Sequence, residues 1–282
     1  MSTVPLHTMP MCARISDIKT MKKLIVFLTC QRCGSSVTAD IFRRHGVSFG
    51  EFSFFNAAPE NRYGWYEAMP IFEIDHILHR VIYGFREDSI HYELAGTIMK
   101  NRNLLRPTAR QIHPELIQQG RAVIQRLVSA GQISAYKHPA SVLFWFYWTH
   151  VFSGIPELEV HPVFLLRPPS GIAASYARRA KRPEWEPSLY DLIHVYLARM
   201  LEVFRGWSEP KSIIRFTDEH YRDDLRVAIE QCGLTWNESR YESGYRSTAT
   251  EQIDKPVGHP VQALYEHWLS LCPTAKQDFI SA

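Results

Sequence analysis

The sequence predicts an α/β protein with a central parallel sheet flanked by helices. Short apolar runs recur along the chain, and each is followed by a polar turn and then by a helical segment. The runs at 22–28, 133–136 and 160–166 are nearly all apolar, which is typical of strands that are buried on both faces of a parallel sheet. A further short strand is predicted at 212–216.

The connecting segments fit this interpretation. The first strand leads into a polar turn at 29–34 and then into a helix at 35–45 that Gly46 ends. A long amphipathic helix is predicted at 188–207. The polar, weakly periodic segment 74–121 is interpreted as helical insertions over one end of the sheet. With no repeat or linker in evidence, we expect a single domain over 21–282, preceded by a flexible tail at 1–20.

The composition excludes several classes of protein. Hydrophobic residues make up 45% of the 282 and charged residues 22%, the balance of a globular protein with a full core. The net charge of +3 is too small to favour nucleic acid as a partner. Five scattered cysteines indicate reduced thiols, and hence a cytoplasmic protein. No apolar run approaches the ~20 residues needed to span a bilayer.

The turn after the first strand has the composition of an anion-binding loop. Backbone N–H groups and the positive end of the following helix both face whatever the turn holds. Gly34 allows a close approach of the backbone, Ser35 and Ser36 add hydroxyl donors, and Arg32 adds a permanent charge. An ordinary strand–helix turn with a capping serine is the alternative.

Two other classes of site compete for this turn. A nucleoside triphosphatase loop would need G-x-x-x-x-G-K-[ST], but Thr29 takes the place of the first glycine and Ser35 that of the lysine. Cys30 and Cys33 form a C-x-x-C pair, the layout of a thioredoxin-like redox site. A zinc site is less favoured, because no second ligand pair completes the four ligands.

A second cluster follows the strand at 160–166. Arg167 directly ends this strand and so points into the crevice where open α/β sheets bind ligands. Ser175, on the helix that follows, can approach the same place. The basic residues after it, at 178–182, are interpreted mainly as a solvated face.

With both segments in view, the chain resembles the sulfotransferases that use 3′-phosphoadenosine 5′-phosphosulfate (PAPS), particularly the bacterial ones. Residues 31–36 resemble their 5′-phosphosulfate loop, R-S-G-T-S, with Cys33 in place of a serine and Ser35 in place of a threonine. Arg167, Pro169 and Ser175 match their 3′-phosphate motif in type and spacing, although Pro168 replaces an aspartate.

Weaker similarities extend this resemblance over about 22–235. The segment 61–67 resembles an N-P-K-G-x-x-E motif, and 214–234 resembles a late strand–helix–G-L unit. The R-K-G motif of eukaryotic members is absent, and Arg240 or Arg246 are candidates to replace it. The resemblance implies a P-loop-like three-layer fold and transfer of a sulfuryl group from PAPS to a hydroxyl or amine of a small molecule, with no metal required.

The resemblance also suggests the catalytic residues. Arg32 would stabilise the leaving charge, and Lys137 would assist at the sulfonate oxygens. His138, whose side-chain type has an unperturbed pKa near neutrality, is the first candidate for the general base. Glu67 is its rival, and His138 could instead merely cap a strand.

Three points stay open at this stage. A thioredoxin-like protein using Cys30 and Cys33, or a nucleotide-binding protein without activity, are the alternatives in function. The aromatic stretch 144–148 favours a core helix over a wall of the acceptor pocket. The acceptor and the oligomeric state are not specified by the sequence.

Overall fold

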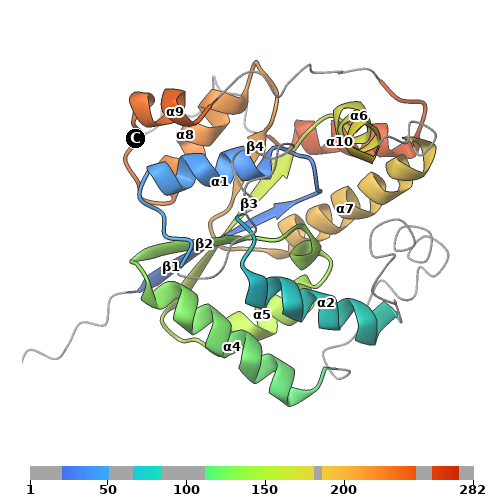
Figure 1. Cartoon of the computed structure of the whole chain (residues 1–282). Helices are drawn as coiled ribbons and strands as arrows, with labels where there is room; N and C mark the ends of the chain where they lie inside the picture. Colours follow the sequence, from blue (N-terminus) through green and yellow to red (C-terminus); the bar gives the residue numbers. More distant parts are fainter. Residues whose placement is uncertain (1–20, 51–65, 84–111, 181–185, 246–255, 273–282) are drawn as a thin grey trace, which may run out of the picture.

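The computed structural model describes residues 21–50, 66–83, 112–180, 186–245 and 256–272 (Figure 1). At its centre lies a parallel sheet in the order β2-β1-β3-β4. The strands are β1 (Lys22–Thr29), β2 (Ile133–Lys137), β3 (Leu158–Leu166) and β4 (Ser212–Arg215). The α/β class predicted from the sequence, with its central parallel sheet and flanking helices, is confirmed.

Helices connect the strands and cover the sheet. They are α1 (Ser35–Arg44), α2 (Met69–Tyr83), α4 (Pro114–Ser129), the 3-10 helix η3 (Pro139–Val142), α5 (Trp145–Ser153), α6 (Pro169–Ala180), α7 (Glu186–Gly206), α8 (Tyr221–Gln231), α9 (Glu238–Gly244) and α10 (Pro260–Ser270). In Figure 1, α1, α8 and α9 lie on one side of the sheet, and α4, α5 and α7 lie on the other. Among the described helices, none is long and apolar enough to cross a bilayer.

The predicted elements agree with the structure to within a few residues. The helix predicted at 35–45 is α1, which ends at Arg44, and Gly46 follows with a φ of 103°. The helix predicted at 188–207 is α7. The aromatic stretch 144–148 lies at the start of α5, where all but Phe146 are buried in the core, as expected.

The segment 74–121 is described at its two ends only. Its first part belongs to α2, which begins earlier, at Met69. Its last part is the start of α4, which packs against β1 and β2 and so belongs to a layer of the fold. The expected tail at 1–20 lies outside the described residues.

The strand order determines where a ligand can bind. From β1 the chain passes to β2 on one side and then returns to β3 on the other, so the connections diverge between β1 and β3. Open α/β sheets bind their ligands outside the carboxyl ends of the strands at such a point. The register pairs Thr29 with Leu165 and Phe27 with Lys137, so the segments that follow β1, β2 and β3 meet at one edge.

One buried histidine within the sheet makes stability depend on pH. His161 in β3 is fully buried, and its Nε2 lies 2.8 Å from Ser212 Oγ. Burial, together with the nearby charge of Lys23, lowers the pKa of His161 to about 4, although Glu159 opposes the shift. The unfolded chain, with a histidine pKa near 6.5, therefore binds the proton first as the pH falls.

We expect His161 to remove up to about 3 kcal/mol of stability between pH 6.5 and pH 4. Urea unfolding at pH 7 and at pH 4.5 measures the difference. In His161→Asn, which does not titrate, this part of the acid sensitivity should disappear. An unchanged pH dependence in that variant would assign the acid sensitivity to other groups.

Candidate functional site

The loop between β1 and α1 has an unusual backbone. Arg32 adopts a left-handed conformation with a φ of 65°, and Gly34 does so with a φ of 82°. Gly34 is the N-cap of α1 and offers no side-chain cap, and the first turn of this helix contains no acidic residue. The positive end of the helix is therefore not offset by a carboxylate of its own first turn, which favours an anion there. Ser35 in this turn is buried and Ser36 is half-buried.

Gly34 is required by its surroundings as well as by its φ. A Cβ at this position would lie 2.4 Å from Cε2 of the Phe216 ring. Phe216 directly follows β4, and its ring also lies under Arg167, whose Cζ is 5.6 Å from the ring centroid. One aromatic ring thus packs against both the loop and the arginine that ends β3.

The two predicted nucleotide motifs are in direct contact. Arg167 donates from a terminal nitrogen to the backbone oxygen of Arg32 over 2.8 Å. Arg32 in turn donates from Nε to Ser175 Oγ over 3.0 Å. A second bond joins α6 to the same loop: the Tyr176 hydroxyl donates to Gln31 Oε1 over 2.6 Å. The structure therefore brings Arg32, Arg167 and Ser175 together, as predicted.

Arg167 is a buried cation, with 7% of its surface exposed. Burial lowers its pKa, and Arg178 adds to the effect, while the Cys33 thiol opposes it. Within the described part of the chain no carboxylate is paired with it. Because a buried charge is costly until a counter-charge approaches it, Arg167 is suited to receive an anion.

The local entry into α6 is intact despite Pro168. The helix begins at Pro169, a position that favours proline, and the Pro168 carbonyl accepts a hydrogen bond from Ile172 N over 3.1 Å. Replacement of the usual aspartate by Pro168 therefore leaves the helix start undisturbed.

The C-x-x-C pair lies inside the loop. Cys30 and Cys33 carry free thiols, and both are fully buried. Burial raises the pKa of Cys30. Burial also opposes ionisation of Cys33, but hydrogen bonds with Cys30 and Thr29 and the charge of Arg167 outweigh it and lower its pKa. Because redox-active cysteines need access to a partner, the complete burial of both sulfurs disfavours a thioredoxin-like function. No group of three or more metal-binding side chains is found in the described ranges.

A buried ion pair lies at the end of β2. Lys137 donates from Nζ to Glu67 Oε1 over 2.7 Å, and both side chains are almost completely buried. The two predicted residues are thus partners, although 70 positions separate them. Glu67, the rival candidate for the base, is held by the lysine that was predicted to assist the sulfonate.

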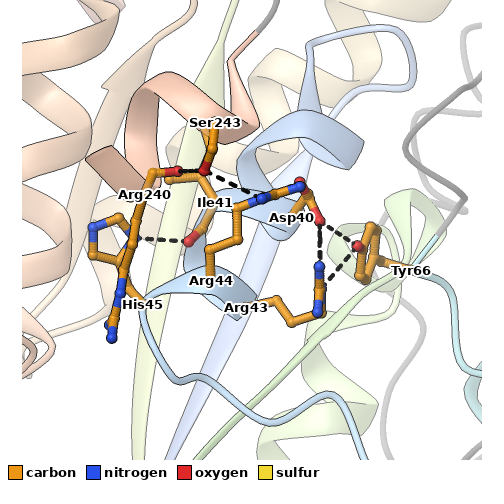
Figure 2. A network of polar contacts seen from close by, with 8 residues as sticks. All are labelled: Asp40, Ile41, Arg43, Arg44, His45, Tyr66, Arg240 and Ser243. Atoms are coloured by element: carbon orange, nitrogen blue, oxygen red, sulfur yellow. Dashed lines mark hydrogen bonds and ion pairs between the residues drawn. The ribbon is translucent and has the colours of Figure 1, made fainter. Parts of the chain in front are cut away.

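Tyr66, the residue before Glu67, has a left-handed φ of 51° and is hydrogen-bonded to two residues of α1. The Tyr66 hydroxyl donates to Asp40 Oδ1 over 2.6 Å, and Arg43 Nε donates to the same hydroxyl over 3.1 Å. Figure 2 shows this network, in which Arg44 also binds Asp40. Of the motif-like segment 61–67, only Tyr66 and Glu67 lie within the described residues.

His138 has a partner that sequence reasoning did not identify. Its Nδ1 lies 2.6 Å from Oδ2 of Asp75, a fully buried carboxylate on α2. The imidazole and the half-buried ring of Phe72 also meet edge to face, with 5.5 Å between their centroids. A signal for Asp75 exists in the sequence, since it shares the buried face of α2 with Ile71, Ile74 and Leu78.

The candidate site thus has two sides along one sheet edge. The loop 30–34 follows β1 and occupies the middle. Arg167 and Ser175 follow β3, and β2 ends at Lys137 with His138 directly after it. Of the candidates to replace the R-K-G motif, Arg240 lies in α9, where its backbone N–H donates to Asn237 and its carbonyl accepts from Ser243, the latter drawn in Figure 2. Arg246 lies outside the described residues.

Comparison with known proteins finds similarity among solved structures. No family model matches the chain, and none of the curated proteins matches it either. Nine chains of solved structures match. One is the sulfotransferase domain from the Synechococcus PCC 7002 olefin synthase, with 15% identity and a TM-score of 0.46 over 92% of this chain and 91% of that one.

Proposed function

We propose that this protein transfers a sulfuryl group from PAPS to a hydroxyl or amine of a small-molecule acceptor. The observation that carries the proposal is the contact between the two predicted nucleotide motifs. Arg167 and Ser175 both bond to Arg32, across more than 130 positions of sequence, at the point where the sheet connections diverge. These contacts among Arg32, Arg167 and Ser175 are what support the proposal.

The nucleotide would bind through two anionic groups. The 5′-phosphosulfate would lie at the loop 30–36, where the N-terminus of α1 and Gly34 favour a close anion. The 3′-phosphate would bind Arg167 and Ser175, and it would bring a negative charge to buried Arg167, with which no carboxylate of the described residues is paired. A triphosphate is less suited to this loop, which has Ser35 where a lysine would be needed.

The proposed reaction is an in-line displacement at sulfur. The acceptor oxygen or nitrogen forms a bond to sulfur, the bond from sulfur to the 5′-phosphate oxygen breaks, and the acceptor proton passes to His138. Charge on the transferred group and on the leaving phosphate would be stabilised by Arg32 and Lys137, so positioning and electrostatics supply most of the catalysis.

The first test concerns the 3′-phosphate. We expect Arg167→Ala to weaken binding of 3′-phosphoadenosine 5′-phosphate (PAP) by about 1.5–3 kcal/mol, the range for hydrogen bonds to charged groups. Binding of adenosine 5′-phosphosulfate, which lacks the 3′-phosphate, should change far less. Isothermal titration of both nucleotides with both proteins measures the difference. Equal losses for the two nucleotides would show that Arg167 does not bind the 3′-phosphate.

A further inference from the structure

The carboxylate of Asp75 is held by three donors from the other side of the candidate site. His138 Nδ1 and Ser141 Oγ each lie 2.6 Å from Oδ2, and Trp148 Nε1 donates to Oδ1 over 2.9 Å. Asp75 and Trp148 are fully buried. A buried carboxylate is tolerated when its oxygens are hydrogen-bonded, and here both are.

Two of these bonds fix Asp75 independently of the histidine. Ser141 belongs to η3 and Trp148 to α5, so α2 is tied to two further elements through this one side chain. The carboxylate therefore has a defined position before the imidazole is considered.

The contact determines which nitrogen of His138 carries the proton. An ionised carboxylate can only accept hydrogen bonds, so Nδ1 must donate. In the neutral ring, Nε2 then carries the lone pair, which is the form that a general base requires. Among the described residues, the charged and titratable groups near the imidazole include Asp75 and, next to the Phe72 ring, His76 on α2. The Lys137–Glu67 pair lies beside them at the end of β2.

We propose that Asp75 is the positioning residue of the general base, an inference that rests on the sulfuryl transfer proposed above. Asp75 holds His138 in the Nδ1–H form and balances the imidazolium that forms when Nε2 takes the acceptor proton. The carboxylate only accepts hydrogen bonds in this role, and the proton remains on Nε2 until solvent removes it. The same division of roles is found wherever a buried carboxylate orients a catalytic histidine.

The kinetic test uses Asp75→Asn, which is close in shape but uncharged. We expect kcat to fall by about 10²–10⁴-fold, the contribution of a positioned base, with little change in PAP affinity. The acid limb of the pH–rate profile should also move, because the charge that stabilises the imidazolium is gone. Ser141→Ala, which removes a donor to the same oxygen but keeps the carboxylate, should leave that limb in place.

A double-mutant cycle separates positioning from general damage to the fold. If Asp75 acts through His138, the variant with both Asp75→Asn and His138→Ala should be within about twofold of His138→Ala alone. Losses that multiply instead, or an acid limb that Asp75→Asn leaves unmoved, would overturn the assignment.

A spectroscopic test is independent of turnover. In long-range ¹H–¹⁵N spectra of ¹⁵N-histidine protein, His138 is identified among the 13 histidines by the signal that His138→Gln removes. We expect the Nδ1–H tautomer in the wild type and the Nε2–H tautomer in Asp75→Asn. An Nε2–H tautomer in the wild type, or no change in the variant, would refute the inference. An absence of transfer from PAPS to any acceptor, with the tautomers as expected, would refute the proposed function alone.

Discussion

Replacing His138 with alanine is expected to lower kcat by about 10²–10⁴-fold, the usual contribution of a positioned proton acceptor. The imidazole lies at the end of β2, with Nδ1 bound to Asp75, so the proposed role leaves Nε2 to act on the acceptor. PAP affinity should barely change, because the proposed nucleotide residues follow β1 and β3. The acid limb of the pH–rate profile should be lost with the histidine. Steady-state kinetics with labelled PAPS between pH 5 and pH 9 measure both effects.

The matched comparison for this variant is Glu67→Gln. Glu67 is bound to Lys137 over 2.7 Å in a buried pair, so the amide should cost stability by leaving the ammonium without its counter-charge. If His138 is the base, Glu67→Gln should keep the acid limb, whatever its effect on kcat. A His138→Ala enzyme with near-normal kcat and an unchanged limb would transfer the role to Glu67.

Replacing Gly34 with alanine is expected to weaken PAP binding by on the order of 10²–10³-fold. A left-handed backbone costs a residue with a Cβ about 1–2 kcal/mol. The new Cβ would also lie 2.4 Å from the Phe216 ring, and such overpacking costs about 1–3 kcal/mol more. Because the loop or the Phe216 ring beneath Arg167 must shift, the proposed nucleotide site should lose its shape. Isothermal titration with PAP measures the loss.

Gly233 offers a matched control for backbone strain. Its φ of 84° is close to the 82° of Gly34, but a Cβ there would meet nothing within 4 Å. Gly233→Ala should therefore lose stability through the backbone alone and keep its affinity for PAP. Equal affinities in Gly34→Ala and Gly233→Ala would show that the close approach of Phe216 has no part in nucleotide binding.

Much of the fold could be predicted because its strands are buried on both faces. Runs such as 22–28, which is apolar from Leu24 onward, stand out from amphipathic helices without any knowledge of tertiary contacts. The candidate nucleotide residues were found for a related reason. Arg167 directly follows β3 and Arg32 lies in the turn after β1, and the carboxyl ends of parallel strands meet at one edge.

The polar partners on the other side of the site could not be predicted in the same way. Asp75 binds His138 across 63 positions, and Tyr66 binds Asp40 across 26, so both contacts depend on how helices pack against the sheet. Helical periodicity places Asp75 on a buried face but does not specify which donors it meets there. The burial of Cys30 and Cys33 was equally hidden, since a C-x-x-C spacing does not indicate exposure.

The most direct test of the account is titration of the wild-type protein with PAP. One molecule should bind per chain with a dissociation constant on the order of 1 μM, and removal of the 3′-phosphate should weaken binding by at least about tenfold. The buried charge of Arg167 and its contact with the loop are the physical basis for that dependence. Absence of binding, or equal affinity for PAP and for adenosine 5′-monophosphate, would contradict the account.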